Sequence, residues 1–278
     1  MPGTAMRFRR LTCGCGVGLA LLVAATQAFA QAAQTPTKPY EPQVGQPGKD
    51  VVWVPTSQVL VDKMLDMAQL TAADSLIDLG SGDGVTVITA AKRGARALGI
   101  EYNPDMVALS TKRAADAGVS DRASFVKADL FESDFSHATV ITMFLLPSIN
   151  MKLRPKLLDL RPGTRIVSNS FSMEDWEADQ MAQVSDCVNW CTALLWIVPA
   201  KVAGSWQLGQ DELRIAQQFQ HVTGTLGSTA FSGGTLKGDE IAFTVDGARY
   251  AGRVEGDTMR GTVTTNGSGR AWTATRRW

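Results

Sequence analysis

The glycine-rich segment 78–84, DLGSGDG, constrains the fold of this chain more than any other stretch of its sequence. It follows the apolar run SLI at 75–77 and precedes a helical pattern over 85–93. Glycines between a strand and a helix permit positive φ and let the backbone approach a ligand closely. The amide groups that open the following helix suit a polar or negatively charged group. The sequence therefore predicts a strand, a ligand-binding turn and a helix in this order.

Strand and helix patterns alternate on both sides of this turn. Strand patterns cover 75–80, 96–102, 123–129, 138–144 and 164–170, and helical patterns cover 85–93, 105–117 and 148–160, after a first helix capped at Thr56 or Ser57. Such alternation with short links is typical of a parallel sheet covered by helices on both faces. We therefore expect a doubly wound, Rossmann-like α/β domain over 51–199, with its ligand crevice at the carboxyl ends of the strands. The segments 180–186 and 191–200 are expected to close the sheet as an antiparallel pair.

The character of the sequence changes after residue 199. The remainder, 200–278, consists of short alternating segments separated by glycine, aspartate and asparagine: 203–208, 213–227, 234–245, 248–256, 258–265 and 270–278. This pattern predicts a β-meander, and hence a second, all-β domain in the form of a small barrel or sandwich. We expect four aromatic residues in its core, namely Trp206, Phe219, Phe231 and Trp272.

The N-terminus has the features of an export signal. Three arginines precede the apolar run 17–25, and the residues at 28–30, Ala-Phe-Ala, form a cleavage site. The run is shorter than the roughly 20 residues of a bilayer span. We therefore expect a signal peptide over 1–30 that is removed, leaving no stable membrane span. The pair Arg9 and Arg10 leaves both Sec and twin-arginine export open, with Sec favoured.

Residues 31–50 are rich in Pro, Gln, Thr and Gly and contain almost no apolar side chains. Such a composition predicts a flexible linker between the cleavage site and the first ordered strand. The sequence therefore predicts an exported protein, periplasmic or secreted.

Composition limits the partners and the chemistry. Lys and Arg together number 27, as do Asp and Glu, so the chain has no basic excess and nucleic acid is not favoured as a partner. Two histidines, His137 and His221, leave little material for a metal site, and none is expected. Beyond the leader, the cysteines are Cys187 and Cys191. A hairpin in an oxidising compartment would bond them, whereas a helix would hold them too far apart, and the sequence leaves both alternatives open.

Three acidic residues lie at or near the ends of the first three predicted strands. Asp78 precedes the first glycine, where a carboxylate suits a cationic amino group better than a pyrophosphate. Glu101 ends the second strand, where an acidic side chain can accept hydrogen bonds from a ribose. Asp129 follows the third strand and is placed to accept from an adenine amino group, although a turn-capping aspartate is the alternative.

Two other enzyme classes are disfavoured by the sequence. Val85 stands where a dinucleotide-binding loop requires Gly or Ala, which disfavours a nicotinamide oxidoreductase. A serine hydrolase is disfavoured because the chain contains no G-x-S-x-G motif.

These motifs carry a resemblance to a known family. The segments DLGSGDG, GIEYNP and KADLF resemble those of class I S-adenosylmethionine-dependent methyltransferases. The flanking segments VWVPTSQVLVDKML and MFLLPSINMKLRPKLLDLRPGTRIVSNSF are similar, more narrowly, to the lysine methyltransferases that modify the c-subunit of ATP synthase. The resemblance covers about 51–176, and neither the leader nor the β-rich tail belongs to the family pattern.

The resemblance implies S-adenosylmethionine as cofactor and residues that surround it. The implied cofactor-binding residues are Asp78, Gly80, Ser81, Gly82, Gly84, Glu101, Asp129 and Leu130. The implied lip of the acceptor site is formed by Phe144, Leu145, Leu146, Pro147 and Ser148, with Trp53, Val54, Pro55 and Thr56 closing over the cofactor from the other side. No catalytic side chain is assigned, because an activated methyl group needs only an aligned, uncharged nucleophile at about 3 Å.

Two functions of different classes follow. The resemblance implies a methyltransferase with a protein lysine as acceptor. The alternative is an exported binding protein that keeps the methyltransferase fold without catalysis. The intact set of Asp78, Gly80, Gly82, Glu101 and Asp129 favours retained cofactor binding.

Overall fold

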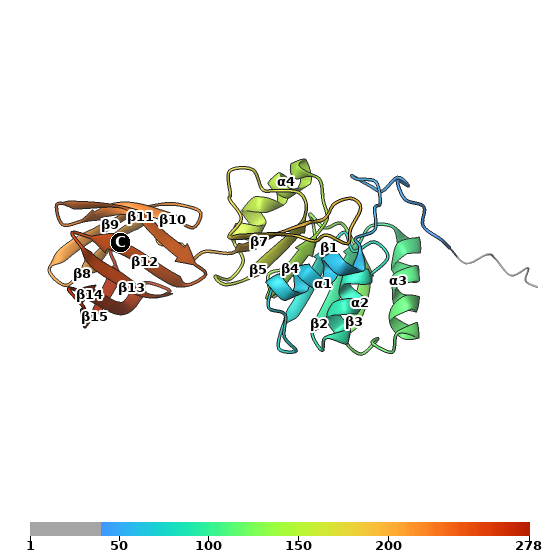
Figure 1. The fold of residues 1–278 in the computed structure, drawn as a ribbon, viewed down its shortest axis with the longest axis horizontal. Coiled ribbons are helices and arrows are strands. Elements are labelled where there is room, and N and C mark those ends of the chain that lie inside the picture. The colour runs from blue at the N-terminus through green and yellow to red at the C-terminus, as the bar shows by residue number, and fades with distance from the viewer. Residues whose placement is uncertain (1–39) are drawn as a thin grey trace, which may run out of the picture. The chain divides into compact units, whose positions relative to one another are not determined.

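The structure is a computed structural model that describes residues 40–278 (Figure 1). The expected signal peptide over 1–30 and the first part of the expected linker lie outside the described residues. Within 40–278, no helix is long and apolar enough to cross a membrane.

A seven-stranded mixed sheet forms the first domain, in the order β3-β2-β1-β4-β5-β7-β6. Its strands are β1 Ser75–Leu79, β2 Arg96–Glu101, β3 Ala123–Lys127, β4 Val140–Met143, β5 Arg165–Asn169, β6 Gln180–Gln183 and β7 Thr192–Ile197. The first five strands pair in parallel and the last two antiparallel, as the alternation of patterns predicts. The chain leaves β1 toward β2 and later returns to β1 on its other side through β4. A ligand crevice is expected at the carboxyl ends of strands that flank such a reversal.

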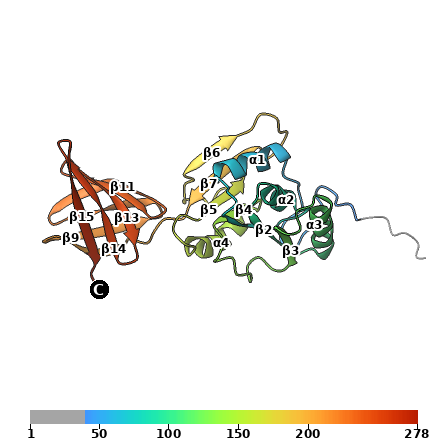
Figure 2. The ribbon, with the colours of Figure 1, turned by 90° about the horizontal axis from the view of Figure 1, so that it is seen from below.

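Helices cover both faces of this sheet. The helices are α1 Gln58–Met67, α2 Val85–Lys92, α3 Pro104–Asp116 and α4 Pro147–Leu158. Alternate strand residues face two separate cores: Leu76 packs with residues of α1, α2 and α3, whereas Ile77 packs with residues of α4. Figure 2 shows the β6–β7 hairpin beside α1. The prediction of a doubly wound, Rossmann-like domain is therefore confirmed.

The glycine turn has the backbone geometry that its sequence predicts. Gly80, Gly82 and Gly84 have φ values of 76°, 51° and 81°, which favour glycine over other residues. Neighbouring side chains leave no room for a Cβ at the last two positions. A Cβ on Gly82 would lie 2.6 Å from the Trp53 indole nitrogen, and one on Gly84 would lie 2.6 Å from the Ser110 Cβ. The turn therefore packs tightly against α3 on one side and against the segment before α1 on the other.

Residues 200–278 fold into a closed antiparallel barrel, in the order β10-β11-β12-β13-β14-β15-β8-β9. Its strands are β8 Gly204–Leu208, β9 Asp211–Gln218, β10 His221–Leu226, β11 Thr229–Lys237, β12 Glu240–Val245, β13 Ala248–Glu255, β14 Thr258–Thr265 and β15 Ser268–Arg276. The last strand pairs with the first, with Ala274 opposite Leu208. A stack of Phe231, Phe243 and Tyr250, with centroids 4.9 Å apart between successive rings, packs in the barrel core. The all-β domain of the sequence prediction is therefore a barrel.

Two details of the barrel differ from the prediction. The segments 213–227 and 234–245 each contain a turn, at Phe219 and Gly238, and so each contributes to two strands. The first turn has no glycine or asparagine, and Phe219 itself adopts a φ of 52°. The expectation that Phe219 lies in the barrel core is wrong, because its ring stacks on Trp176, 5.9 Å away, in the core that includes α4.

We expect Gly84→Ala to destabilise the protein by about 1–3 kcal/mol more than Gly118→Ala, because an added Cβ overpacks the first site only. Gly118 is a matched control, since its φ is 68° and nothing lies within 4 Å of its Cβ position. Urea unfolding of both variants measures the difference. Equal destabilisation would show that backbone strain alone accounts for the cost at Gly84.

Candidate functional site

A cavity lies at the carboxyl ends of the central strands, next to the glycine turn. Thirteen of the residues that the sequence assigns to the site line it: Trp53, Val54, Pro55, Thr56, Asp78, Gly80, Ser81, Glu101, Asp129, Leu130, Phe144, Leu145 and Leu146. The structure thus gathers residues from the segment before α1 and from the ends of β1, β2, β3 and β4 at one place. Gly82 and Gly84, assigned to the same site, shape the turn without being among the lining residues, and Pro147 and Ser148 open α4 beside the cavity.

Asp78 is a buried carboxyl group on the cavity wall. Its residue is 7% exposed, and the Thr142 hydroxyl donates a hydrogen bond of 2.7 Å to its Oδ1. Burial raises the pKa of the Asp78 carboxyl to about 7, and the charges of Glu101 and Asp83 act in the same direction, whereas the hydrogen bond from Thr142 lowers it. Burial destabilises the charged form of this carboxyl group, and a cationic partner nearby would stabilise it. The site therefore suits a ligand with a protonated amino group.

Glu101 is held at both oxygens by backbone amides. The Gly82 amide donates to Oε2 at 2.9 Å, and the Asn103 amide donates to Oε1 at 2.8 Å. A carboxylate has about four lone-pair sites, so two of them stay free to accept from a ligand. This side chain therefore orders the glycine turn and leaves acceptor capacity for hydroxyl groups.

Asp129 has two partners in the structure. Its Oδ1 accepts from the Phe131 amide at 2.9 Å, and its Oδ2 pairs with the Lys49 ammonium. The Lys49 hydrogen bond, followed by that of the Phe131 amide, holds the pKa of this carboxyl below its usual value. Asp129 thus makes the turn-capping contact that the sequence left open. An adenine-binding role for it stays a prediction.

The segment 46–50, part of the expected linker, lines the same cavity. Backbone hydrogen bonds hold it: Gly45 N donates to Trp53 O at 2.8 Å, and Trp53 N donates to Gln46 O at 3.0 Å. Lys49 lies over the Tyr102 ring, 5.0 Å from its centroid. The segment therefore packs across the crevice with Trp53 against the glycine turn.

Three aromatic rings form the outer part of the cavity wall. Phe144 follows β4, Phe171 follows β5, and Trp190 lies in the loop between β6 and β7; all three line the cavity. Trp190 is 5.0 Å from Phe171 and 6.0 Å from Phe144, measured between ring centroids. We call these three residues the aromatic rim.

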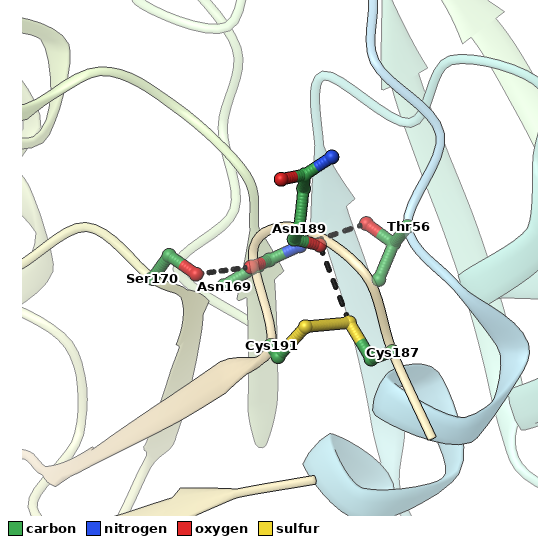
Figure 3. Close-up of a disulfide and its surroundings, with 6 residues drawn as sticks. All are labelled: Thr56, Asn169, Ser170, Cys187, Asn189 and Cys191. Carbon is green, nitrogen blue, oxygen red and sulfur yellow. Dashed lines mark hydrogen bonds between the residues drawn. A yellow bond between two sulfur atoms is a disulfide. The ribbon is translucent and has the colours of Figure 1, made fainter. Parts of the chain in front are cut away.

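The loop that carries Trp190 is closed by a disulfide between Cys187 and Cys191 (Figure 3). The cysteines therefore take the hairpin arrangement, one of the two that the sequence left open. Figure 3 also shows the Asn169 side chain donating to the Thr56 hydroxyl, at 3.3 Å, beside this loop. This contact links the end of β5 to the segment before α1.

Among the residues of the site that sequence reasoning did not assign are Lys49, Tyr102, Thr142, Phe171 and Trp190. For two of them, the sequence contains a feature that could have pointed to the site. Thr142 is a lone polar residue in the apolar strand VITM and lies opposite Asp78 in the sheet register. Trp190 stands between the two paired cysteines. Within 40–278, no group of three or more His, Cys, Asp or Glu residues is arranged to hold a metal ion.

Comparisons with known proteins find methyltransferases. The model of the ANTKMT methyltransferase domain matches residues 78–180. The chain is 42% identical over 139 residues to a protein-lysine N-methyltransferase of Saccharolobus islandicus, an alignment that covers 49% of this chain and 86% of the relative. It is 34% identical over 130 residues to the lysine N-methyltransferase of the ATP synthase c-subunit from Homo sapiens, covering 46% of this chain and 55% of the relative.

A solved methyltransferase structure is similar to about half of this chain. The crystal structure of an RNA methyltransferase from Salinibacter ruber, in complex with S-adenosyl-L-homocysteine, is 46% identical to this chain, with a TM-score of 0.51. The match covers 54% of this chain and 96% of that structure. The matched share of this chain is close to the length of the domain at 51–199.

We expect Asp78→Asn to stabilise the protein by about 2–3 kcal/mol more at pH 8 than at pH 5. The pKa of this carboxyl in the folded state, about 7, lies above its ordinary value of 3.8. The protonated carboxyl therefore favours the folded state below pH 4, and this contribution is lost as the pH rises through 7. Asparagine carries no charge at either pH, so the variant does not lose stability through ionisation at this position. Chemical denaturation at both pH values measures the effect.

Asp121→Asn is the control for this experiment, because Asp121 is an exposed carboxyl group paired with Arg122. It should show no comparable difference between the two pH values. A pH-independent effect of Asp78→Asn would mean that Asp78 is charged in the folded protein throughout this range.

Proposed function

The chain belongs to the protein-lysine N-methyltransferase family, and on this premise we propose that it transfers a methyl group from S-adenosylmethionine to a lysine side chain of a protein. One observation carries the proposal. A single cavity combines the acidic set Asp78, Glu101 and Asp129 with the aromatic rim. The first set fits the cofactor, and the second fits an apolar side chain with an amine at its end.

The acidic set matches the polar groups of the cofactor. Asp78 would accept from the protonated amino group, which would stabilise its buried carboxylate. Glu101 would accept from the ribose hydroxyls with the lone pairs that the two backbone amides leave free. Asp129 and Leu130 would contact the adenine. The Ser81 hydroxyl is buried without a hydrogen-bond partner among the described residues and could bond to the cofactor.

The cofactor, when bound, supplies an activated methyl group. The chain has to bring a lysine amine to it in the neutral form. Phe144 and Leu145 lie at the cavity wall, and their apolar surfaces remove water from the amine, which lowers the pKa of a lysine. The acidic residues of the cavity attract the cationic lysine before it enters. The ammonium would release its proton to water before the nitrogen bonds the methyl carbon, and the broken methyl–sulfur bond would leave S-adenosylhomocysteine. No general base among the side chains of the site is then needed.

A second candidate acceptor, RNA, is raised by the Salinibacter ruber neighbour. The charge of this chain argues against it. The cavity lining contains Asp50, Asp78, Asp83, Glu101 and Asp129 against Lys49 alone, and polyanions bind to basic surfaces. A protein acceptor is therefore favoured.

We expect the purified protein to place label from methyl-labelled S-adenosylmethionine on lysine residues of proteins in a cell lysate, detected by mass spectrometry. Glu101→Ala should weaken cofactor binding by about 1.5–3 kcal/mol, because it removes hydrogen bonds to a charged group. Glu255→Ala is the control, since that side chain is exposed in the barrel.

Two results would contradict the proposal in different ways. Label in RNA alone would make the protein an RNA methyltransferase. Tight cofactor binding without label in any fraction would favour the alternative of a binding protein that keeps the fold without catalysis.

We further propose that the protein is exported and works in the periplasm or outside the cell. The first support for export is the signal-peptide pattern in the sequence of residues 1–30, which lie outside the described residues. The Cys187–Cys191 disulfide is another, because disulfides persist in oxidising compartments.

We expect residues 1–49, fused to alkaline phosphatase, to give an active enzyme if the route is Sec, since this reporter matures after Sec export. Fused to a fluorescent protein that folds before transport, the same residues should give periplasmic fluorescence if the route is twin-arginine export. Activity of neither fusion, together with native protein whose N-terminus is uncut, would contradict export.

A further inference from the structure

We propose that Trp190, held by the Cys187–Cys191 disulfide, is a specificity-determining residue that binds the acceptor lysine together with Phe144 and Phe171. This inference rests on the proposed function, because it assigns the acceptor of the same site. Trp190 and both cysteines lie beyond the residues 78–180 that the ANTKMT domain model matches.

The disulfide loop fixes where Trp190 can lie. The strands β6 and β7 pair from Gln180 opposite Leu195 to Gln183 opposite Thr192. One further backbone hydrogen bond, from Val184 N to Cys191 O at 3.0 Å, extends the ladder to the disulfide. Trp190 is the residue next to Cys191 and has a left-handed φ of 58°. A cross-link of five residues thus restricts the backbone that places its indole.

The three rings come from separate elements and meet at the cavity. Phe144 and Phe171 stack at 5.9 Å, and Trp190 lies at 5.0 Å from Phe171 with its ring tilted by 44°. Trp190 is nonetheless 45% exposed. A large aromatic side chain that is half-exposed at a cavity mouth has surface left for a ligand.

The chemistry of the rim selects a long side chain with a cationic end. Aromatic faces attract ammonium groups by cation–π interaction, most strongly in the case of Trp. The four-carbon stem of lysine provides apolar surface that the same rings can cover. Methylation keeps the charge of a lysine, so a partly methylated lysine would bind at the rim as well.

Binding can be measured without turnover. The probe is the methylamide of Nα-acetyl-Nε,Nε-dimethyllysine, and its neutral counterpart is Nα-acetylnorleucine methylamide. The Trp190 indole signal is assigned in a proton–nitrogen spectrum by its absence from Trp190→Phe. We expect this signal to shift and saturate with the lysine probe and to respond about tenfold more weakly to the norleucine probe.

The variants separate acceptor binding from cofactor binding. Trp190→Ala should lower the affinity for the lysine probe about tenfold, and Trp190→Phe should lower it less, because phenylalanine keeps an aromatic face. In turnover assays Trp190→Ala should raise the KM for protein acceptor while kcat changes less than about twofold. Calorimetry should give the same Kd for S-adenosylmethionine in each variant, which also shows that the protein is folded.

The role of the disulfide is tested in the same assays. The double variant Cys187→Ser/Cys191→Ser should reproduce the loss of probe affinity without a change in cofactor Kd. Met181→Ala is the matched control, because Met181 lies on the same hairpin, is 74% exposed and is not among the cavity lining residues. Its affinity for the probe should equal that of the unaltered protein.

The outcomes distinguish this inference from the proposed function. A saturable shift at Trp190 with the expected losses supports the inference. Lysine methylation in lysate without a shift at Trp190, or without an effect of Trp190→Ala on the KM for acceptor, overturns it and leaves the proposed function intact. Label in RNA alone, with no response to the lysine probe, overturns both.

Discussion

The carboxylate of Glu101 is the contact on which the arrangement of the site depends. It accepts from the amide of Gly82 in the glycine turn and from the amide of Asn103, whose own side chain caps α3. One side chain thus joins the turn after β1 to the end of β2 and the start of α3. Three residues of the turn have positive φ. The hydrogen bond from the Gly82 amide to Glu101 is one of the contacts that hold the turn in this conformation. The floor of the cavity follows from this bridge.

The cavity lining has an acidic part and an aromatic part, and the two lie at different places. Its floor is acidic and hydrogen-bonded, as Asp78 and Glu101 show, and suits a polar, zwitterionic ligand. Its outer wall is aromatic and suits an alkyl chain. A neutral amine is needed for attack, whereas the acidic floor attracts a cation. The segment 46–50 lines the same cavity and packs beside the floor.

Local patterns predicted the sheet domain and the site floor because their signals lie within short stretches. Asp78 lies near the end of β1 and Glu101 ends β2, and the pairing of these two strands brings their ends together. The contacts that sequence reasoning missed join distant segments. Lys49 meets Asp129 across 80 positions, and Phe219 leaves the barrel core to stack on Trp176. No periodicity encodes such pairs, since they arise from how the elements pack.

The closure of the barrel has a consequence for how this chain folds. Every strand pairing in it joins neighbours in sequence, except that of β15 with β8. Pairings between neighbours close short loops and form early, whereas the last one closes a loop of more than 50 residues at a higher cost in entropy. Until that final pairing forms, β8 and β15 are open sheet edges that other chains can extend. The speed of this single step therefore sets how long a newly made molecule is exposed to aggregation.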